Sequence, residues 1–426
     1  MQSESGDLFM EKNRFLPIIL GSDENAYGNA RLFAEAYGIK PLMLCKHRLI
    51  PTEASRLFDR ITIENFDRSE VFKRELLRLL EEKKREYEAI VVVPCSDYYI
   101  NLLSEHAADF EKYICNRVVP YDLLCKLNTK DRFYELCDRF GVDYPKTLIV
   151  SPEKREGALQ DSGFVFPIVV KPENSNAAEY LHCDFKGKKK VFFVNSQEEY
   201  REIVKEMNRS DYRGNLILQE FIPGGDDAMR VVNTYSGNDG KTRLVSLGQP
   251  VLEEYSPSTL GNYAAIISRS EESLCRRISE FLDRLHYTGF ANFDLKYDTR
   301  TGKYMMFEIN CRPGRSSFYV RGAGCNMMKL MTEDAVFGMG GGETVYTDTR
   351  ALWTAVPKGV LMKYVKNDVL KAEVKELWRE GKVSRTLFCP GDMSFERRLR
   401  ICRYYYGYYR RYSQYYFDKE NQKESK

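Results

Sequence analysis

The sequence predicts an α/β protein that also contains α+β elements. Short apolar runs, typical of buried strands, alternate with amphipathic helical segments from residue 15 onward. Two alternating runs, 290–298 and 303–310, flank a polar segment that contains Gly302, which is typical of a β-hairpin. The 426 residues suffice for two or three domains of about 100–200 residues each. We expect domains at 1–120, 121–345 and 346–426.

The first domain is predicted to be a parallel α/β sheet. An apolar run ends at residue 20, and a polar loop then leads into a helix, the order that begins such a sheet. The predicted strands are 15–20, 41–45 and 89–94, and the predicted helices are 27–37 and 69–87. No G-x-G-x-x-G follows the first strand, so the sequence does not predict a dinucleotide-binding turn.

The second domain is predicted to begin near Tyr121. Its first helix is closed by Gly141, and a later strand ends in Lys171. The strand LILQEFI stops at a Pro-Gly-Gly turn. The predicted helices are 131–140, 198–208 and 271–285, and the predicted strands are 166–171, 190–194, 216–222, 229–235 and 243–247, followed by the hairpin.

The third domain is predicted to hold a strand at 351–356, a mostly helical segment at 360–380 and a tyrosine-rich helix at 396–417. Residues 396–412 include six arginines and one acidic residue. Such a helix could lie on an anionic membrane surface or contact nucleic acid. The favoured interpretation is that its tyrosines pack on the protein while its arginines face water. The tail at 418–426 is predicted to be disordered.

Composition excludes several classes of protein. The net charge is +3, so no global field attracts nucleic acid, and we expect no nucleic-acid partner. Eleven cysteines without C-x-x-C spacing argue against a disulfide framework, and four histidines outside any H-E-x-x-H argue against a zinc hydrolase. No uncharged apolar run of 18 residues occurs. We therefore expect a cytoplasmic protein, which the basic helix could bring to the inner face of the membrane.

The hairpin predicts a cation site. A loop at 299–303 would place Asp294 directly opposite Glu308, with Asn310 on the same polar face. Opposed carboxylates repel each other, and Mg²⁺, which prefers oxygen ligands and accompanies substrate phosphates, would resolve the conflict. The alternative is a solvated face on which Lys296 and Arg312 balance the charge.

In order along the chain, Lys130, Lys171, the strand LILQEFIPGG and the hairpin Asp294…Glu308-x-Asn310-x-Arg312 resemble the ATP-grasp superfamily. The strings LPIILGSDENAYGNARLFAEAYG, FPIVVKPENS, YTGFANFDLKYD and FEINCRPGRSS resemble the D-aspartate ligase family of Gram-positive bacteria. The resemblance implies a Rossmann-like pre-ATP-grasp domain, then an ATP-grasp domain of two subdomains that enclose ATP, then a C-terminal extension.

The resemblance also implies which residues bind ATP and metal. Lys130 and Lys171 would neutralise the α- and β-phosphates. Gln219, Glu220, Phe221 and Ile222 would contact adenine, and Asp227 the ribose. Asp294, Glu308 and Asn310 would hold Mg²⁺, with Mn²⁺ as an alternative. Many relatives carry a glycine-rich loop over the phosphates, whereas this chain has Asn174, Ser175 and Asn176 in that stretch.

Arg312 matches the arginine that faces an acyl phosphate, and Arg315 and Ser316, with Ser317, would hold a substrate carboxylate. Lys296, on the same hairpin, completes the candidate catalytic group. Ser22, Asp23, Asn25 and Tyr27 match the family's first loop, which would face the cleft.

The implied reaction joins a carboxylate to an amine. ATP phosphorylates the carboxylate, and an amine attacks the resulting acyl phosphate. In the family, the β-carboxylate of D-aspartate is joined to the lysine side chain of a peptidoglycan precursor, so the expected partners are a small carboxylate or amino acid and a peptide amine. The alternatives are a ligase for another carboxylate, a non-catalytic nucleotide-binding protein or a surface-binding protein. The sequence does not predict an oligomeric state.

Overall fold

The computed structural model describes residues 15–173, 178–257 and 259–416. The chain divides into two compact units. The larger unit combines residues up to Asn128 with Gly225–Leu295 and residues from Glu308 onward. The smaller unit combines Thr129–Gly224 with Lys296–Phe307, which is the tip of the hairpin. The division into three domains at residues 120 and 345 stays a prediction.

The N-terminal part of the larger unit contains a parallel sheet with strand order β3-β2-β1-β4. Its strands are β1 (Phe15–Leu20), β2 (Leu42–Cys45), β3 (Asp59–Thr62) and β4 (Ala89–Pro94). Its helices are α2 (Glu24–Tyr37), α3 (Ser69–Lys83), α4 (Asp97–Glu105), α5 (Ala107–Phe110), α6 (Tyr121–Asn128) and the 3₁₀ turn η2 (Ile50–Thr52). The predicted parallel α/β arrangement is confirmed. The polar edge strand β3 was not predicted, because its DRIT sequence lacks an apolar run.

Helix α2 begins three residues before its predicted start. The side chain of Asp23 accepts a hydrogen bond from the backbone N–H of Ala26 at 3.0 Å and so caps the helix. Gly38 ends the helix in the left-handed conformation, with φ of 69°. The loop between β1 and α2 therefore spans only residues 21–23, and it places Asp23 and the first helical residue, Glu24, just beyond the carboxyl end of the strand.

The large sheet of the same unit has strand order β13-β12-β9-β10-β11-β15-β16, and β14 pairs with β10. Its strands are β9 (Met229–Ser236), β10 (Thr242–Glu253), β11 (Tyr263–Arg269), β12 (Gly289–Asp298), β13 (Lys303–Asn310), β14 (Val345–Tyr346), β15 (Leu352–Thr354) and β16 (Val383–Ser384). The accompanying helices are η4 (Asp226–Ala228), α10 (Glu272–Arg284), α11 (Tyr319–Gly322) and α12 (Met327–Ala335). The predicted hairpin is confirmed, whereas β11 was not predicted and β10 extends beyond the predicted 243–247.

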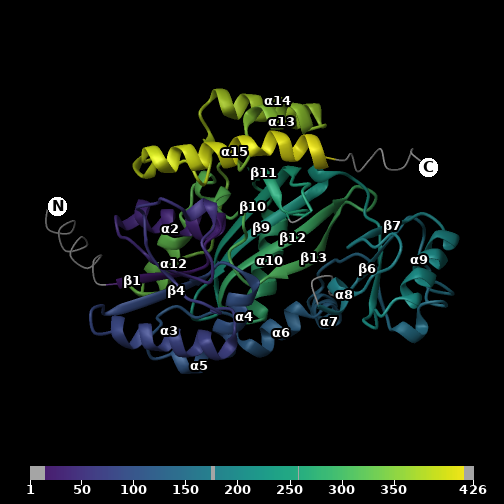
Figure 1. Cartoon of the computed structure of the whole chain (residues 1–426), viewed down its shortest axis with the longest axis horizontal. Helices are drawn as coiled ribbons and strands as arrows, with labels where there is room; N and C mark the ends of the chain where they lie inside the picture. The colour runs from purple at the N-terminus through teal and green to yellow at the C-terminus, as the bar shows by residue number, and fades with distance from the viewer. Residues whose placement is uncertain (1–14, 174–177, 258, 417–426) are drawn as a thin grey trace. The chain divides into compact units, whose positions relative to one another are not determined.

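Three C-terminal helices pack together on the side of β10 and β11 (Figure 1). They are α13 (Lys358–Tyr364), α14 (Asp368–Arg379) and α15 (Phe395–Tyr415), with the 3₁₀ turn η5 (Pro390–Asp392) before α15. The mostly helical segment expected at 360–380 is confirmed. It consists of two helices, because Asn367 caps a second one by accepting from the N–H groups of Val369 and Leu370. The packing of tyrosines from α15 is confirmed, since Tyr408 and Tyr412 lie in the core.

The smaller unit contains an antiparallel sheet with strand order β5-β8-β6-β7. Its elements are α7 (Lys130–Phe140), β5 (Thr147–Val150), η3 (Pro152–Lys154), β6 (Ile168–Pro172), α8 (Ala178–His182), β7 (Phe192–Val194), α9 (Gln197–Arg209) and β8 (Leu216–Glu220). Strand β6 pairs with β8 so that Val169 lies opposite Gln219 and Lys171 opposite Ile217. The unit has an apolar core of its own.

Two further predictions concern the described residues as a whole. All eleven cysteines are free, as expected from their spacing. Among the helices of the described ranges, none is both long and apolar enough to cross a membrane.

Candidate active site

The acidic residues of the hairpin lie close together in the larger unit. Asp294 on β12 accepts a hydrogen bond from the Tyr263 hydroxyl at 2.8 Å, and the Asn310 amide nitrogen donates to its second oxygen at 3.2 Å. Burial raises the pKa of Asp294 above its usual range, and the nearby charge of Glu308 raises it further. The structure therefore brings the three predicted metal ligands together.

The donor set of the hairpin fits a hard cation. The Asp294 carboxylate is desolvated and repelled by Glu308, and a divalent cation would relieve both effects. An amide that donates through its nitrogen can still ligate a metal through its oxygen, as Asn310 would. Within the described ranges, no three residues drawn from His, Cys, Asp and Glu form a metal cluster, so any site here depends on the amide as well.

Arg312 follows the hairpin and is held by an aspartate from the parallel sheet. Its Nε and Nη2 donate to the two carboxylate oxygens of Asp97 at 2.7 and 3.1 Å, and its Nη1 donates to the carbonyl of Pro313 at 3.2 Å. A two-bonded arginine–carboxylate pair fixes the plane of the guanidinium. Sequence reasoning did not identify Asp97, although its place just after β4 is where ligands bind in parallel sheets.

Arg315 lies in a buried cluster of charges. Its Nη1 is 2.8 Å from Oε1 of Glu254, and its Nη2 is 3.8 Å from Oε2 of Glu24. The Tyr408 hydroxyl donates to Glu254 at 3.1 Å. Burial raises the pKa of Glu24 to about 7, against the opposing effect of Arg315. We refer to Arg315, Glu24, Glu254 and Tyr408 as the Arg315 cluster.

Sequence reasoning missed most of the Arg315 cluster. Glu24, Glu254 and Tyr408 come from α2, the end of β10 and α15, which are far apart in the chain. The first loop does reach this region, because the Asn25 amide donates to the carbonyl of Pro313 at 2.9 Å. Tyr27 does not belong to the cluster, since its hydroxyl donates to Asp392 at 2.9 Å. Ser316 and Ser317 are buried beside the arginines in sequence.

In the smaller unit, Lys171 and Gln219 lie on neighbouring strands. The Lys171 ammonium donates to the Gln219 amide oxygen at 3.4 Å. The Gln219 amide nitrogen donates to the hydroxyls of Tyr134 and Thr147, each at 2.9 Å. This network orients a buried glutamine at the position predicted to contact adenine. Tyr134 and Thr147 were not predicted, because their contact with β8 depends on tertiary structure.

The remaining predicted residues of the smaller unit have separate partners. Lys130 Nζ donates to the carbonyl of Phe307 at 3.2 Å. Glu220 pairs with Arg300 at 2.8 Å. Lys296 Nζ donates to the carbonyl of Gly224 at 2.7 Å and lies 5.4 Å from the ring centroid of Phe221.

The other residues predicted to contact ATP lie in the larger unit, outside the described ranges, or at the end of the predicted adenine segment. Asp227 belongs to the larger unit, where its carboxylate accepts from the Asn367 amide at 2.8 Å. Asn174, Ser175 and Asn176, which were expected to cover the phosphates, lie outside the described residues. Ile222 is buried at the end of the predicted adenine segment.

We compared the chain with protein families, with curated proteins and with solved structures. No family model matches the sequence. The chain is 38% identical over 421 residues to a D-aspartate ligase from Enterococcus faecium (strain Aus0004), across 96% of this chain and 99% of that protein.

Solved structures resemble the chain at low sequence identity. An ADP complex of N5-carboxyaminoimidazole ribonucleotide synthetase matches with a TM-score of 0.58 and 14% identity, over 86% of this chain and 97% of that one. An L-amino acid ligase from Bacillus licheniformis matches with a TM-score of 0.51 and 15% identity, over 76% and 74% of the two chains. Likenesses at such low identity describe the fold alone.

Proposed function

Because the chain belongs to the D-aspartate ligase family and has the ATP-grasp fold, we propose that it is an ATP-dependent ligase for D-aspartate. It would join the β-carboxylate of D-aspartate to the side-chain amine of a lysine in a peptidoglycan precursor, through an acyl phosphate. The observation that carries this proposal is the 38% identity to a D-aspartate ligase over nearly the full length of both proteins.

We assign nucleotide contacts to the smaller unit and metal ligands to the larger unit. Lys130 and Lys171 would neutralise phosphate oxygens, and the backbone and side chains of 219–222 would receive adenine. Asp294, Glu308 and Asn310 would hold Mg²⁺, which supplies positive charge to the transferring phosphoryl group. The desolvated Asp294 carboxylate supports this assignment, because it has no cationic hydrogen-bond partner among the described residues.

Arg312 would stabilise the negative charge that develops when the carboxylate is activated and when the amine attacks. Its guanidinium is already oriented by Asp97, so little reorganisation is needed during the reaction. Asp97 is a positioning residue in this scheme, since it acts through Arg312.

The Arg315 cluster would recognise the amino acid. D-aspartate carries two carboxylates and one ammonium group, and the cluster offers one guanidinium and two buried carboxylates. Oε2 of Glu254 is buried and makes no hydrogen bond within the described part of the chain. A substrate ammonium would satisfy this oxygen, while Arg315 would bind a substrate carboxylate.

A screen of D- and L-amino acids tests the proposed function. Purified protein is incubated with ATP, Mg²⁺ and each amino acid, ADP release is measured, and hydroxylamine traps the acyl phosphate as a hydroxamate. We expect hydroxamate from D-aspartate and much less from L-aspartate. Hydroxamate from another carboxylate but never from D-aspartate would reject the specific function and retain an ATP-grasp ligase.

We propose that the reaction takes place in the cytoplasm and that helix α15 contacts the inner face of the membrane. Phe395, Leu399 and Tyr406 are 79%, 57% and 61% exposed, and arginines lie among them in the sequence. Sedimentation with phosphatidylglycerol vesicles tests this contact. We expect salt-sensitive binding that Leu399→Asp weakens, and equal binding to phosphatidylcholine vesicles would contradict an electrostatic contact.

A further inference from the structure

The carboxyl ends of β1 and β4 lie side by side in the larger unit. In the parallel sheet, β1 pairs with β2 on one side and with β4 on the other, so the strand order reverses between β1 and β4. Ligands of open α/β sheets bind beyond the carboxyl ends of the strands at such a reversal. Asp23 lies in the loop after β1, and Asp97 begins the helix after β4. These two aspartates are therefore placed where a substrate is expected.

The loop that holds Asp23 contacts the segment that follows the hairpin. The Asn25 amide nitrogen donates to the carbonyl of Pro313 at 2.9 Å. Asp23, two residues earlier, lies close enough to Arg312 and Arg315 for the positive charge of each to lower its pKa. It is only partly buried, so a ligand can reach it. Asp23 is thus a carboxylate at the site where Arg312 would stabilise the reacting group.

The other carboxylates beside these two arginines already have side-chain partners. They are Asp97 on Arg312, and Glu24 and Glu254 on Arg315. Asp23 instead accepts from the backbone N–H of Ala26 at 3.0 Å, and within the described ranges no side chain donates a hydrogen bond to it. Its carboxylate is therefore held in place by the backbone while it keeps its capacity for a ligand.

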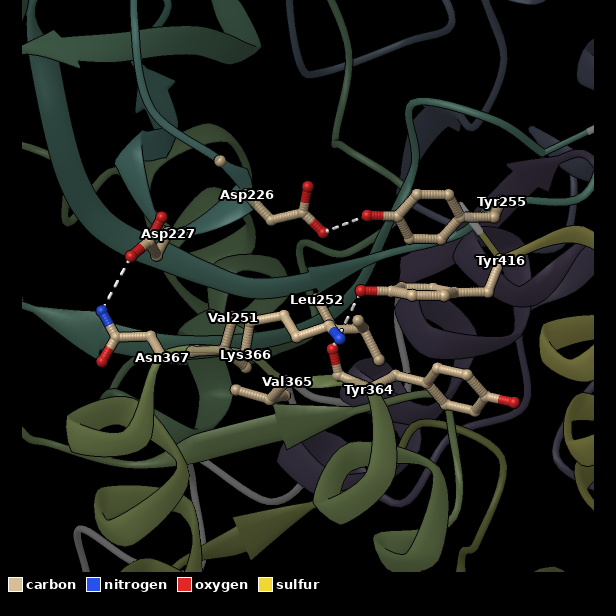
Figure 2. A pocket seen from close by; sticks show the side chains of 11 residues that line it. Asp226, Asp227, Val251, Leu252, Tyr255, Tyr364, Val365, Lys366, Asn367 and Tyr416 are labelled. Carbon is tan, nitrogen blue, oxygen red and sulfur yellow. Dashed lines mark hydrogen bonds between the residues drawn. The ribbon is translucent and has the colours of Figure 1, made fainter. Parts of the chain in front are cut away.

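Two further acidic residues line a pocket of about 240 Å³ in the same unit (Figure 2). Its walls include Asp226, Asp227, Tyr255, Asn367 and Tyr416. Asp226 accepts from the Tyr255 hydroxyl at 2.9 Å, and Asp227 accepts from the Asn367 amide at 2.8 Å. Both carboxylates already accept hydrogen bonds within that pocket, so we assign them no part in proton transfer.

The surroundings of Asp23 suit a proton acceptor. Desolvation raises the pKa of its carboxyl group, and this effect is larger than the opposing effects of the Ala26 N–H and the two arginines. A raised pKa makes a carboxylate a stronger base. The charged and titratable groups that face it include Arg312, Arg315, Glu24, Cys95 and Tyr98.

The proposed reaction needs such a group in its second step. A lysine side chain, with a pKa of about 10.4, is protonated at neutral pH, and an ammonium nitrogen has no lone pair with which to attack. Asp294 and Glu308 are assigned to the metal ion, and Asp97 is occupied by Arg312. Asp23 is the remaining carboxylate beside Arg312 that can take the proton.

We propose that Asp23 binds the ammonium group of the amine acceptor and takes one proton from it. The nitrogen then attacks the acyl carbon, a C–N bond forms, and the C–O bond to the phosphate breaks with its electron pair passing to the phosphate. The second proton, lost as the amide forms, passes to the released phosphate, and Asp23 returns its own proton to water. This inference rests on the proposed function, because it assigns a residue to the second step of that reaction.

Two nucleophiles of different protonation test the inference in the full-length protein. Hydroxylamine is largely unprotonated at neutral pH and needs no base, whereas the lysine of a peptidoglycan peptide is protonated. Asp23→Asn removes the base but keeps the cap of α2, because asparagine caps helices as well as aspartate does. We expect the ratio of the peptide ligation rate to the hydroxamate formation rate to fall about 100-fold. Asp368→Asn, at the exposed start of α14, is the matched control and should leave the ratio unchanged.

The pH profile separates proton transfer from a purely structural role. In the wild type, kcat/KM for the peptide should level off once Asp23 is ionised. In Asp23→Asn the acceptor must lose its proton to water, so kcat/KM should keep rising about tenfold per pH unit towards the pKa of lysine. A variant profile that levels off as the wild-type profile does, or an unchanged ratio of the two rates, would overturn the inference.

The wild-type protein alone tests the proposed function. Absence of hydroxamate from every carboxylate would reject the ligase, and the role of Asp23 with it. If the wild type forms hydroxamate and ligates the peptide while Asp23→Asn does both equally well, the ligase is retained and only the role of Asp23 is overturned. An equal fall in both rates would also overturn this role, because it would mean that Asp23 acts on activation of the carboxylate.

Discussion

Asp294 and Asp298 belong to the same strand, yet their surroundings have opposite effects on their charge. Asp298 receives hydrogen bonds from the Arg300 guanidinium, at 2.9 Å to one oxygen and 2.8 Å to the other, and these bonds lower its pKa. Asp294 receives only neutral donors, and its pKa is raised by burial and then by Glu308. The compensated carboxylate holds the turn of the hairpin, whereas the uncompensated one is suited to an external cation.

Replacing Glu308 tests whether the acidic pair, Asp294 and Glu308, holds a metal ion. Glu308→Gln should lower ATP turnover about 1000-fold, because one charged metal ligand is lost, while the melting temperature stays unchanged or rises as repulsion is relieved. ADP release and thermal unfolding measure the two effects. Glu272→Gln, an exposed helical glutamate, is the control. Near-normal ADP release would reject the metal assignment.

Arg312 has a charged partner, Asp97, as Asp298 has in Arg300, and yet we assign it to catalysis. Arg312→Lys keeps the charge but loses the two-bonded geometry, so kcat should fall about 100-fold with little change in KM. The rate of hydroxamate formation measures this step. Asp97→Asn should lower kcat less, in the same direction, and an unaffected rate in both variants would remove Arg312 from the mechanism.

Replacing Asp298 tests whether this residue contributes to the stability of the hairpin rather than to catalysis. Asp298→Asn should destabilise the protein by about 1–3 kcal/mol, since charge-assisted hydrogen bonds to Arg300 and backbone bonds of the turn weaken. The backbone N–H of Gly302 donates to the Asp298 carbonyl at 2.8 Å, so the turn itself is expected to form. Denaturant unfolding measures the loss. Activity per folded molecule should stay within about twofold, and a large fall in kcat would mean that the two aspartates are not separate in function.

The smallest effect that we expect is a pH dependence of the stability contributed by Asp298. Because the Arg300 hydrogen bonds lower the folded pKa of Asp298, its stabilising contribution is fully present above its unfolded pKa of about 3.9 and is lost as the pH falls further. The difference in melting temperature between the wild type and Asp298→Asn should therefore hold down to about pH 4 and shrink as the pH falls below that value. A difference that stays constant as the pH falls further would contradict the ionic character of the Asp298–Arg300 pair.

The sequence predicted what depends on local patterns. The strands of the hairpin and the parallel sheet follow from apolar periodicity, and the acidic pair follows from the register of the hairpin. The partners Asp97, Glu254 and Tyr408 could not be predicted, because they meet the hairpin arginines only through contacts between distant segments. The break between α13 and α14 was not predicted, because neither proline nor glycine marks it and Asn367 instead caps the start of α14.

The position of α15 has a consequence for the synthesis of the protein. The hydroxyls of Tyr408 and Tyr412 in α15 donate hydrogen bonds to the Glu254 side chain and the Glu253 carbonyl, and Tyr416, the next residue after the helix, lines the pocket of Figure 2. A nascent chain that has reached residue 390 already contains Lys130 and Lys171, which we propose to bind phosphate, and the acidic hairpin. We expect such a chain to bind nucleotide before it can bind the amino acid, because the Arg315 cluster is completed only when Tyr408 of α15 has been added.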